Sequence, residues 1–205
     1  LYLKDFKDDI DEVILRAREL GVGRFVLPNV DRSTYQDMIS LASKYPGICF
    51  PMIGLHPCSV KENYMEELSF VEERLHSGEF YGIGEIGIDL YWDKTNIEAQ
   101  KNCFALQINM AKNLELPIVI HCRESFNEIF EVLDRLNDEK LHGIFHCFTG
   151  NLEQAVKIIN YGGFKLGIGG VITFKNSGLD KTIEHIGLEH LVLETDSPYL
   201  APVPY

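Results

Sequence analysis

The sequence has no long apolar run. No stretch approaches the roughly 20 consecutive apolar residues of a membrane-spanning helix, although 45% of the 205 residues are hydrophobic. The first residues, Leu-Tyr-Leu-Lys-Asp-Phe, do not have the basic start and apolar centre of a signal peptide. We therefore expect neither a membrane protein nor an exported one.

Basic residues are also scarce. The chain has 19 Lys and Arg against 31 Asp and Glu, which gives a net charge of −12. A protein that binds long duplex DNA neutralises many phosphates with a basic face, so this balance disfavours a tight duplex-binding module. It does not exclude an enzyme that handles a single phosphodiester through bound cations, because the metals then supply the positive charge.

Cysteine is present in an odd number and without the spacing of a structural site. The five cysteines include no Cys-x-x-Cys pair, and those inside apolar runs are expected to act as small hydrophobic residues. This pattern argues against a disulfide framework and against a thiolate zinc site. It predicts a cytoplasmic protein.

Helical and apolar segments alternate along the whole chain. Strands are predicted for 24–30, 48–56, 81–88, 117–122, 143–147, 164–172 and 190–194, and helices for 5–20, 33–44, 62–76, 96–114, 124–136, 152–160 and 179–185. Strands that are apolar on both faces and separated by helices form parallel sheets. The pattern thus predicts one α/β domain over 1–205, either a doubly wound sheet or a TIM-type (β/α)8 barrel, and seven strands are one short of eight.

Acids and imidazoles stand where five of these apolar runs end. They are His56, Glu85, His121, His146 and the pair Glu194 and Asp196. Taken singly, each has an ordinary explanation, such as a structural histidine or a turn before Ser197-Pro198. Together these residues require a common explanation, since burying such groups costs several kcal/mol each unless they are paired or metal-bound. A parallel barrel gathers its active site at this end of its strands, so we expect a divalent-metal site.

Five short runs resemble the motifs of the TatD family of metal-dependent hydrolases. They are G-L-H-P (54–57), G-E-I-G-I-D (84–89), I-H-C-R-E (120–124), F-H-C-F-T-G (145–150) and E-T-D-S-P-Y-L (194–200). The resemblance implies a TIM-type barrel that holds two divalent cations, Mg, Mn or Zn. It implies that Glu85 bridges them, that His121 and His146 bind one, and that Asp196 binds the other. It also implies deoxyribonuclease activity with 3′-5′ exonuclease character.

The sequence departs from the family pattern at one motif. The family opens with a strand ending in His-x-His, and this sequence contains none. We therefore expect a fragment with seven of the eight strands, without the first strand and the C-terminal helix. In such a segment the cation at Asp196 is expected to bind weakly, and the cation at Glu85, His121 and His146 to bind better.

Five further residues have weaker assignments. Arg123 and His56 are predicted to contact substrate. The equally open alternatives are a salt bridge to Glu124 or another acid for Arg123 and a structural role for His56. Asp89 is expected to orient other groups of the site. Tyr91 and Trp92 follow as a pair, and for them packing is favoured over base stacking.

The predicted reaction is hydrolysis of a phosphodiester in DNA, at single strands or 3′ ends, with no obligate protein partner. Bound cations would lower the pKa of a water, and Asp196 would accept its proton, which makes Asp196 and Glu85 the predicted catalytic residues. Two alternatives stay open. One is hydrolysis of a small amide, lactone or ester by the same metals, and the other is a barrel that serves as an inactive scaffold.

Overall fold

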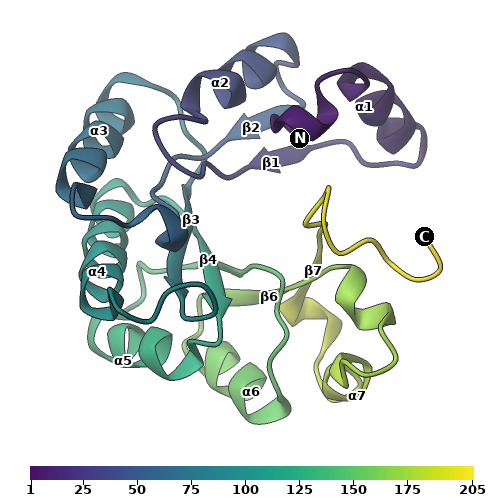
Figure 1. Cartoon of the computed structure of the whole chain (residues 1–205). Coiled ribbons are helices and arrows are strands. Elements are labelled where there is room, and N and C mark those ends of the chain that lie inside the picture. The colour runs from purple at the N-terminus through teal and green to yellow at the C-terminus, as the bar shows by residue number, and fades with distance from the viewer.

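The computed structural model describes all 205 residues, and parallel strands alternate with helices along the chain (Figure 1). The strands are β1 (Phe25–Leu27), β2 (Cys49–Pro51), β3 (Ile83–Asp89), β4 (Ile118–Arg123), β5 (Gly143–Phe145), β6 (Phe164–Ile168) and β7 (Leu191–Leu193). The helices are α1 (Ile10–Glu19), α2 (Tyr35–Lys44), α3 (Tyr64–Ser77), α4 (Ile97–Leu114), α5 (Phe126–Leu136), α6 (Leu152–Asn160) and α7 (Leu179–Ile183). No helix is long and apolar enough to cross a membrane.

The strand order decides between the two architectures. β1 pairs with β2, and β3 to β7 pair in sequence order, all in parallel. A parallel bridge between Ile53 and Ile83 joins the two sheets. The order therefore runs from β1 to β7 without the reversal of a doubly wound sheet. The helices lie outside the ring of strands (Figure 1). This is the arrangement of a (β/α) barrel, with no pairing between β1 and β7.

The main core lies between the strands and the surrounding helices. It is a cluster of 26 buried residues, in which Ile83, Ile118 and Phe104 are fully buried. Helix α4 also carries two buried glutamines that hydrogen-bond to backbone. Gln100 accepts from the N–H of Asp89 at 2.8 Å, and Gln107 accepts from the N–H of Leu55 at 2.7 Å. These bonds fix the backbone where β3 ends and just before His56.

Several strands are shorter than the apolar runs that predict them. β2 ends at Pro51, although buried apolar residues continue to Leu55 and Ile53 still forms the isolated bridge with Ile83. β6 stops at Ile168, where the chain enters a 3₁₀ turn. β3 differs in the other direction: it continues to Asp89, one residue past the predicted range, with a register shift between Ile83 and Ile86. Glu85 thus lies inside this strand and not at its end.

Candidate metal centre

The four predicted ligands lie at the same end of the sheet. Glu85 is in β3, His121 in β4, His146 directly after β5, and Asp196 in the segment after β7. All four are half-buried. Close packing of the strands is needed here, since a Cβ at Gly87 would lie 2.1 Å from the carbonyl oxygen of His121. Only glycine fits at this position, where φ is +140°.

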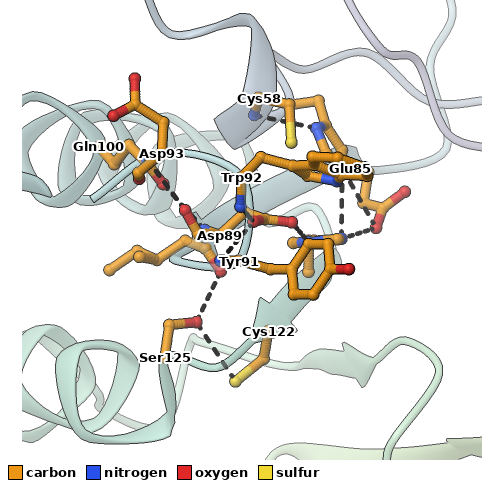
Figure 2. A network of polar contacts seen from close by, with 12 residues as sticks. Cys58, Glu85, Asp89, Tyr91, Trp92, Asp93, Gln100, Cys122 and Ser125 are labelled. Atoms are coloured by element: carbon orange, nitrogen blue, oxygen red, sulfur yellow. Dashed lines mark hydrogen bonds and ion pairs between the residues drawn. The ribbon is translucent and has the colours of Figure 1, made fainter. Parts of the chain in front are cut away.

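His121 is held between two carboxylates. Its Nε2 lies 2.8 Å from Oδ2 of Asp89, and its Nδ1 lies 2.9 Å from Oε1 of Glu85. The other oxygen of Asp89 accepts the backbone N–H groups of Tyr91 and Trp92 at 2.9 and 3.1 Å (Figure 2). Asp89 is therefore anchored by backbone, as expected of an orienting residue, whereas Glu85 receives no such hydrogen bond.

His146 has the same arrangement. Its Nδ1 lies 2.9 Å from Oε2 of Glu194, and its Nε2 lies 3.1 Å from Oδ1 of Asp196. Glu194 also accepts the backbone N–H of Cys147 through its other oxygen. Sequence reasoning gave Glu194 no role of its own, and the signal available for it was its place two residues before Asp196, directly after an apolar run. The centre thus contains two carboxylate–imidazole–carboxylate triads.

Each triad leaves an imidazole nitrogen facing a carboxylate that no backbone group anchors. When the anchored carboxylate accepts the ring N–H, the opposite nitrogen keeps its lone pair. Two ligand atoms about 2.1 Å from a cation are about 3.0 Å apart in octahedral geometry and about 3.4 Å apart in tetrahedral geometry. His121 Nδ1 and the facing oxygen of Glu85 are 2.9 Å apart, which suits two ligands of one cation, and His146 Nε2 lies 3.1 Å from the neighbouring carboxylate of Asp196. These residues fit divalent cations.

The charges of the triads follow from the same contacts. Burial lowers the pKa of both imidazoles, but hydrogen bonds with the flanking carboxylates outweigh it and raise the pKa of His121 to about 9 and of His146 to about 11. Burial raises the pKa of Glu85, yet the hydrogen bond with His121 and the charge of His146 bring it to about 2. Glu85 therefore interacts electrostatically with the imidazoles of both triads.

His56 is close to this group, but its hydrogen bonds do not suit a metal ligand. Its Nε2 lies 3.2 Å from Nδ1 of His121 and 3.8 Å from Oε1 of Glu85, so distance alone would group the three as ligands. However, Nδ1 of His56 accepts the backbone N–H of Cys58 at 3.1 Å. Burial lowers the pKa of His56 to about 4, so the ring is neutral and its one proton is on Nε2. A protonated nitrogen donates a hydrogen bond and cannot bind a cation.

Arg123 and the two aromatic residues lie beside the centre. The guanidinium carbon of Arg123 lies 3.8 Å from the ring centroid of Tyr91, and Glu124 pairs with Lys94 at 3.5 Å and not with Arg123. The alternative of an Arg123–Glu124 salt bridge is therefore wrong. Tyr91 and Trp92 pack against each other, yet both remain in solvent, since Trp92 is 70% exposed and Tyr91 49%.

Comparisons with known proteins show which family the chain resembles over its whole length. The family described as TatD related DNase matches residues 1–205. The chain is 35% identical to the uncharacterized metal-dependent hydrolase YabD of Bacillus subtilis, and the match covers 100% of this chain and 80% of that protein. It is 32% identical to the 3′-5′ ssDNA/RNA exonuclease TatD of Erwinia tasmaniensis, covering 96% of this chain and 76% of that protein. The crystal structure of YjjV, a TatD homolog from Escherichia coli, superposes with a TM-score of 0.91 at 28% identity, covering 99% of this chain and 78% of that one.

Proposed function

Because the chain belongs to the TatD family of metal-dependent hydrolases, we propose that it cleaves phosphodiester bonds in single-stranded nucleic acid with 3′-5′ exonuclease character. Family membership makes the chain a hydrolase that acts on ester bonds, and the proposal concerns its substrate, its metals and its residues. The observation that carries it is the pair of carboxylate–imidazole–carboxylate triads, which present unanchored acids to oriented imidazoles at one end of the barrel.

Two divalent cations, Mg, Mn or Zn, are the proposed cofactors. We assign Glu85, His121 and His146 to one of them, and Asp196 with a share of Glu85 to the other. The charge of His146 acts on Glu85, which supports a bridging position for that carboxylate. When bound, the cations would polarise the phosphoryl group and lower the pKa of a bound water.

The residues around the cations have separate tasks. Asp196 accepts one hydrogen bond, from His146, so its second oxygen is free to accept the proton of the attacking water. His56 directs its Nε2–H toward the centre and would donate it to a phosphate oxygen. Asp89 and Glu194 keep the imidazoles in the required tautomer.

The name of a relative, the 3′-5′ ssDNA/RNA exonuclease of Erwinia tasmaniensis, favours nucleic acid as the substrate over a small amide, lactone or ester. The unpaired guanidinium of Arg123 beside the centre also suits a phosphate. The free state of all five cysteines supports the proposed cytoplasmic location, because disulfides are rare there.

A substrate screen tests the proposal. The chain is incubated with Mn²⁺, Mg²⁺ or Zn²⁺ and with single-stranded oligonucleotides labelled at the 5′ end, with either a free or a blocked 3′ end. Parallel reactions contain a small amide, lactone and ester. Stepwise shortening that requires the free 3′ end supports the proposal. Hydrolysis of the small substrates alone would replace it with the first alternative, and no hydrolysis with any cation would favour an inactive scaffold.

A further inference from the structure

An exposed surface lies where β3 and β4 end, beside the candidate metal centre. We call Tyr91, Trp92 and Arg123 the aromatic ledge. The two rings meet edge to face, with centroids 4.9 Å apart and an interplanar angle of 89°. The guanidinium carbon of Arg123 lies 3.8 Å from the ring centroid of Tyr91 and 5.6 Å from that of Trp92. Three large side chains are thus gathered together in solvent.

The ledge is connected to the centre by hydrogen bonds of Asp89. The same Asp89 carboxylate that hydrogen-bonds to His121 accepts the backbone N–H groups of Tyr91 and Trp92 (Figure 2). Asp89 and Arg123 are also partners in the ladder between β3 and β4. Arg123 is two residues beyond His121 in β4, which places it on the same face of the strand and about 7 Å further along it.

Packing within the ledge leaves much of its surface exposed to solvent. Trp92 is the one tryptophan of the chain and leaves most of its ring in water. The guanidinium of Arg123 makes no hydrogen bond or ion pair within the chain, although acidic side chains outnumber basic ones. Both groups therefore keep their binding capacity: a flat π-face, and five N–H donors suited to phosphate.

The cavity next to Trp92 restricts where a ligand could lie. It has a volume of about 40 Å³ and is lined in part by Lys61, Asp89 and Trp92. This is room for about one water molecule and not for a nucleobase. A base would therefore stack on the solvent-exposed face of Trp92.

We propose that the aromatic ledge binds a nucleotide of a single-stranded nucleic acid next to the bond that is cleaved, with its base stacked on Trp92 and its phosphate held by Arg123. This inference rests on the proposed function and specifies how its substrate is bound. Stacking on an aromatic ring tolerates any base, and one guanidinium is enough for one phosphate. Such a contact suits a chain without a basic face, because it needs few charges.

Fluorescence of Trp92 tests the stacking directly, since no other tryptophan contributes. The chain with Mn²⁺ is mixed in a stopped-flow instrument with a short oligodeoxythymidylate, and emission is followed before cleavage proceeds. The matched ligand is an abasic oligonucleotide with the same number of phosphates. We expect quenching with the first and little change with the second. Equal signals from both, or no signal, would overturn the ledge.

Kinetics on two substrates give the second measurement. For Trp92→Ala we expect the ratio of kcat/KM on the oligonucleotide to kcat/KM on bis(p-nitrophenyl) phosphate to fall about tenfold, which corresponds to one lost base stack. Trp92→Phe should restore much of it. Tyr81→Ala is the control, because Tyr81 is 51% exposed but lies just before β3, at the opposite end of the strand from Asp89.

The two measurements separate failure of the ledge from failure of the proposed function. In one case the oligonucleotide is cleaved, but Trp92 quenching is the same with and without bases and Trp92→Ala does not lower the kcat/KM ratio. The ledge is then wrong and the nuclease assignment stands. If Trp92 is quenched in a base-dependent way but nothing is cleaved, the ledge stands and the nuclease assignment is wrong. If neither binding nor cleavage is seen, both are wrong.

Discussion

The carboxylate of Asp89 and the Nε2 of His121 lie 2.8 Å apart, and this contact connects the metal centre to the loop after β3. Asp89 is almost fully buried, and the hydrogen bonds from His121 and the loop outweigh its burial and lower its pKa to about 2. It is therefore a permanent acceptor. When the imidazole of His121 is neutral, Asp89 keeps its one proton on Nε2 and leaves Nδ1 directed at Glu85.

Replacing Asp89 with Asn should disturb the metal centre without unfolding the barrel. The amide oxygen can still accept the backbone N–H groups of the loop, but its NH₂ group would face Nε2 of His121. The imidazole would then carry its proton on Nδ1, where a cation should bind. Loss of such an orienting partner reduces metal affinity roughly 10- to 100-fold, measurable by titration calorimetry with Zn²⁺.

Asp93→Asn is the control for this change. Asp93 is in the same loop, but its carboxylate accepts only from Thr95. We expect unchanged metal affinity for that variant and similar circular dichroism spectra for both. Equal affinities for the two variants would contradict the orienting role of Asp89.

Substitutions of Glu85 and Arg123 should affect different kinetic parameters, kcat for Glu85 and KM for Arg123. Glu85→Gln removes the charge that both cations are proposed to share, so hydrolysis should fall to the background rate while the fold is kept. Arg123→Ala should mainly raise KM for an oligonucleotide, because Arg123 is proposed to touch substrate and not metal. Initial rates over a range of substrate concentrations measure both. Mild and similar losses for the two variants would count against these assignments.

Metal binding should release protons. The pKa of His121 is about 9 and that of His146 about 11, both above the ordinary 6.5, so both imidazoles are protonated near pH 7 in the cation-free chain. A cation requires the neutral ring. Affinity should therefore rise between pH 6 and pH 9, by up to about tenfold per pH unit for each proton displaced. Calorimetry in two buffers of different ionisation enthalpy counts the protons, and pH-independent affinity would contradict the prediction.

The same groups predict how the stability of the cation-free chain varies with pH. The raised pKa values of His121 and His146 mean that their contribution is complete below pH 6.5 and is lost as pH rises through 9 and 11. The lowered pKa values of Glu85 and Asp89 give a contribution present above about pH 4.5 and lost toward pH 2. In EDTA, the Tm should be highest between these limits. A Tm that keeps rising from pH 7 to pH 10 would oppose this view.

The order of helices and strands could be predicted from periodicity because each element has its own signal. The predicted range 152–160 coincides with α6, where Asn151 and Gln154 form a capping box. Strand ends were harder to predict. Leu55 is as buried as a strand residue, but it packs into the core beyond the last ladder bond of β2. Periodicity also could not choose the barrel, because a doubly wound sheet has the same alternation and differs only in strand order.

The candidate site could be predicted as a list of residues but not as a set of contacts. A sequence shows that acids and histidines end the strands, yet it does not show which carboxylate is anchored by backbone. That distinction separates Glu194 from Asp196, and it depends on the N–H of Cys147, 47 residues away from Glu194. The exposure of Trp92 could not be predicted for a related reason. It depends on the turn that closes on Asp89, which leaves the residue 70% exposed.

Gly167 gives a test of Glu194 that leaves every charged residue in place. This glycine is in β6, and a Cβ there would lie 2.4 Å from the carboxylate of Glu194. In Gly167→Ala the flexible carboxylate must move, which breaks its hydrogen bonds with His146 and with the N–H of Cys147. We expect metal affinity and hydrolysis to fall roughly 10- to 100-fold, as for the loss of an orienting partner, with a small change in Tm.

Gly169→Ala is the control, since a Cβ at that position is 3.5 Å from the nearest atom, the carbonyl oxygen of Glu194, and φ is −110°. The double variant Gly167→Ala/Glu194→Ala should lose no more activity than Glu194→Ala alone, because both changes remove the same contact. If Gly167→Ala keeps full metal binding while Glu194→Ala loses it, Glu194 acts from a different position than the one adjoining His146.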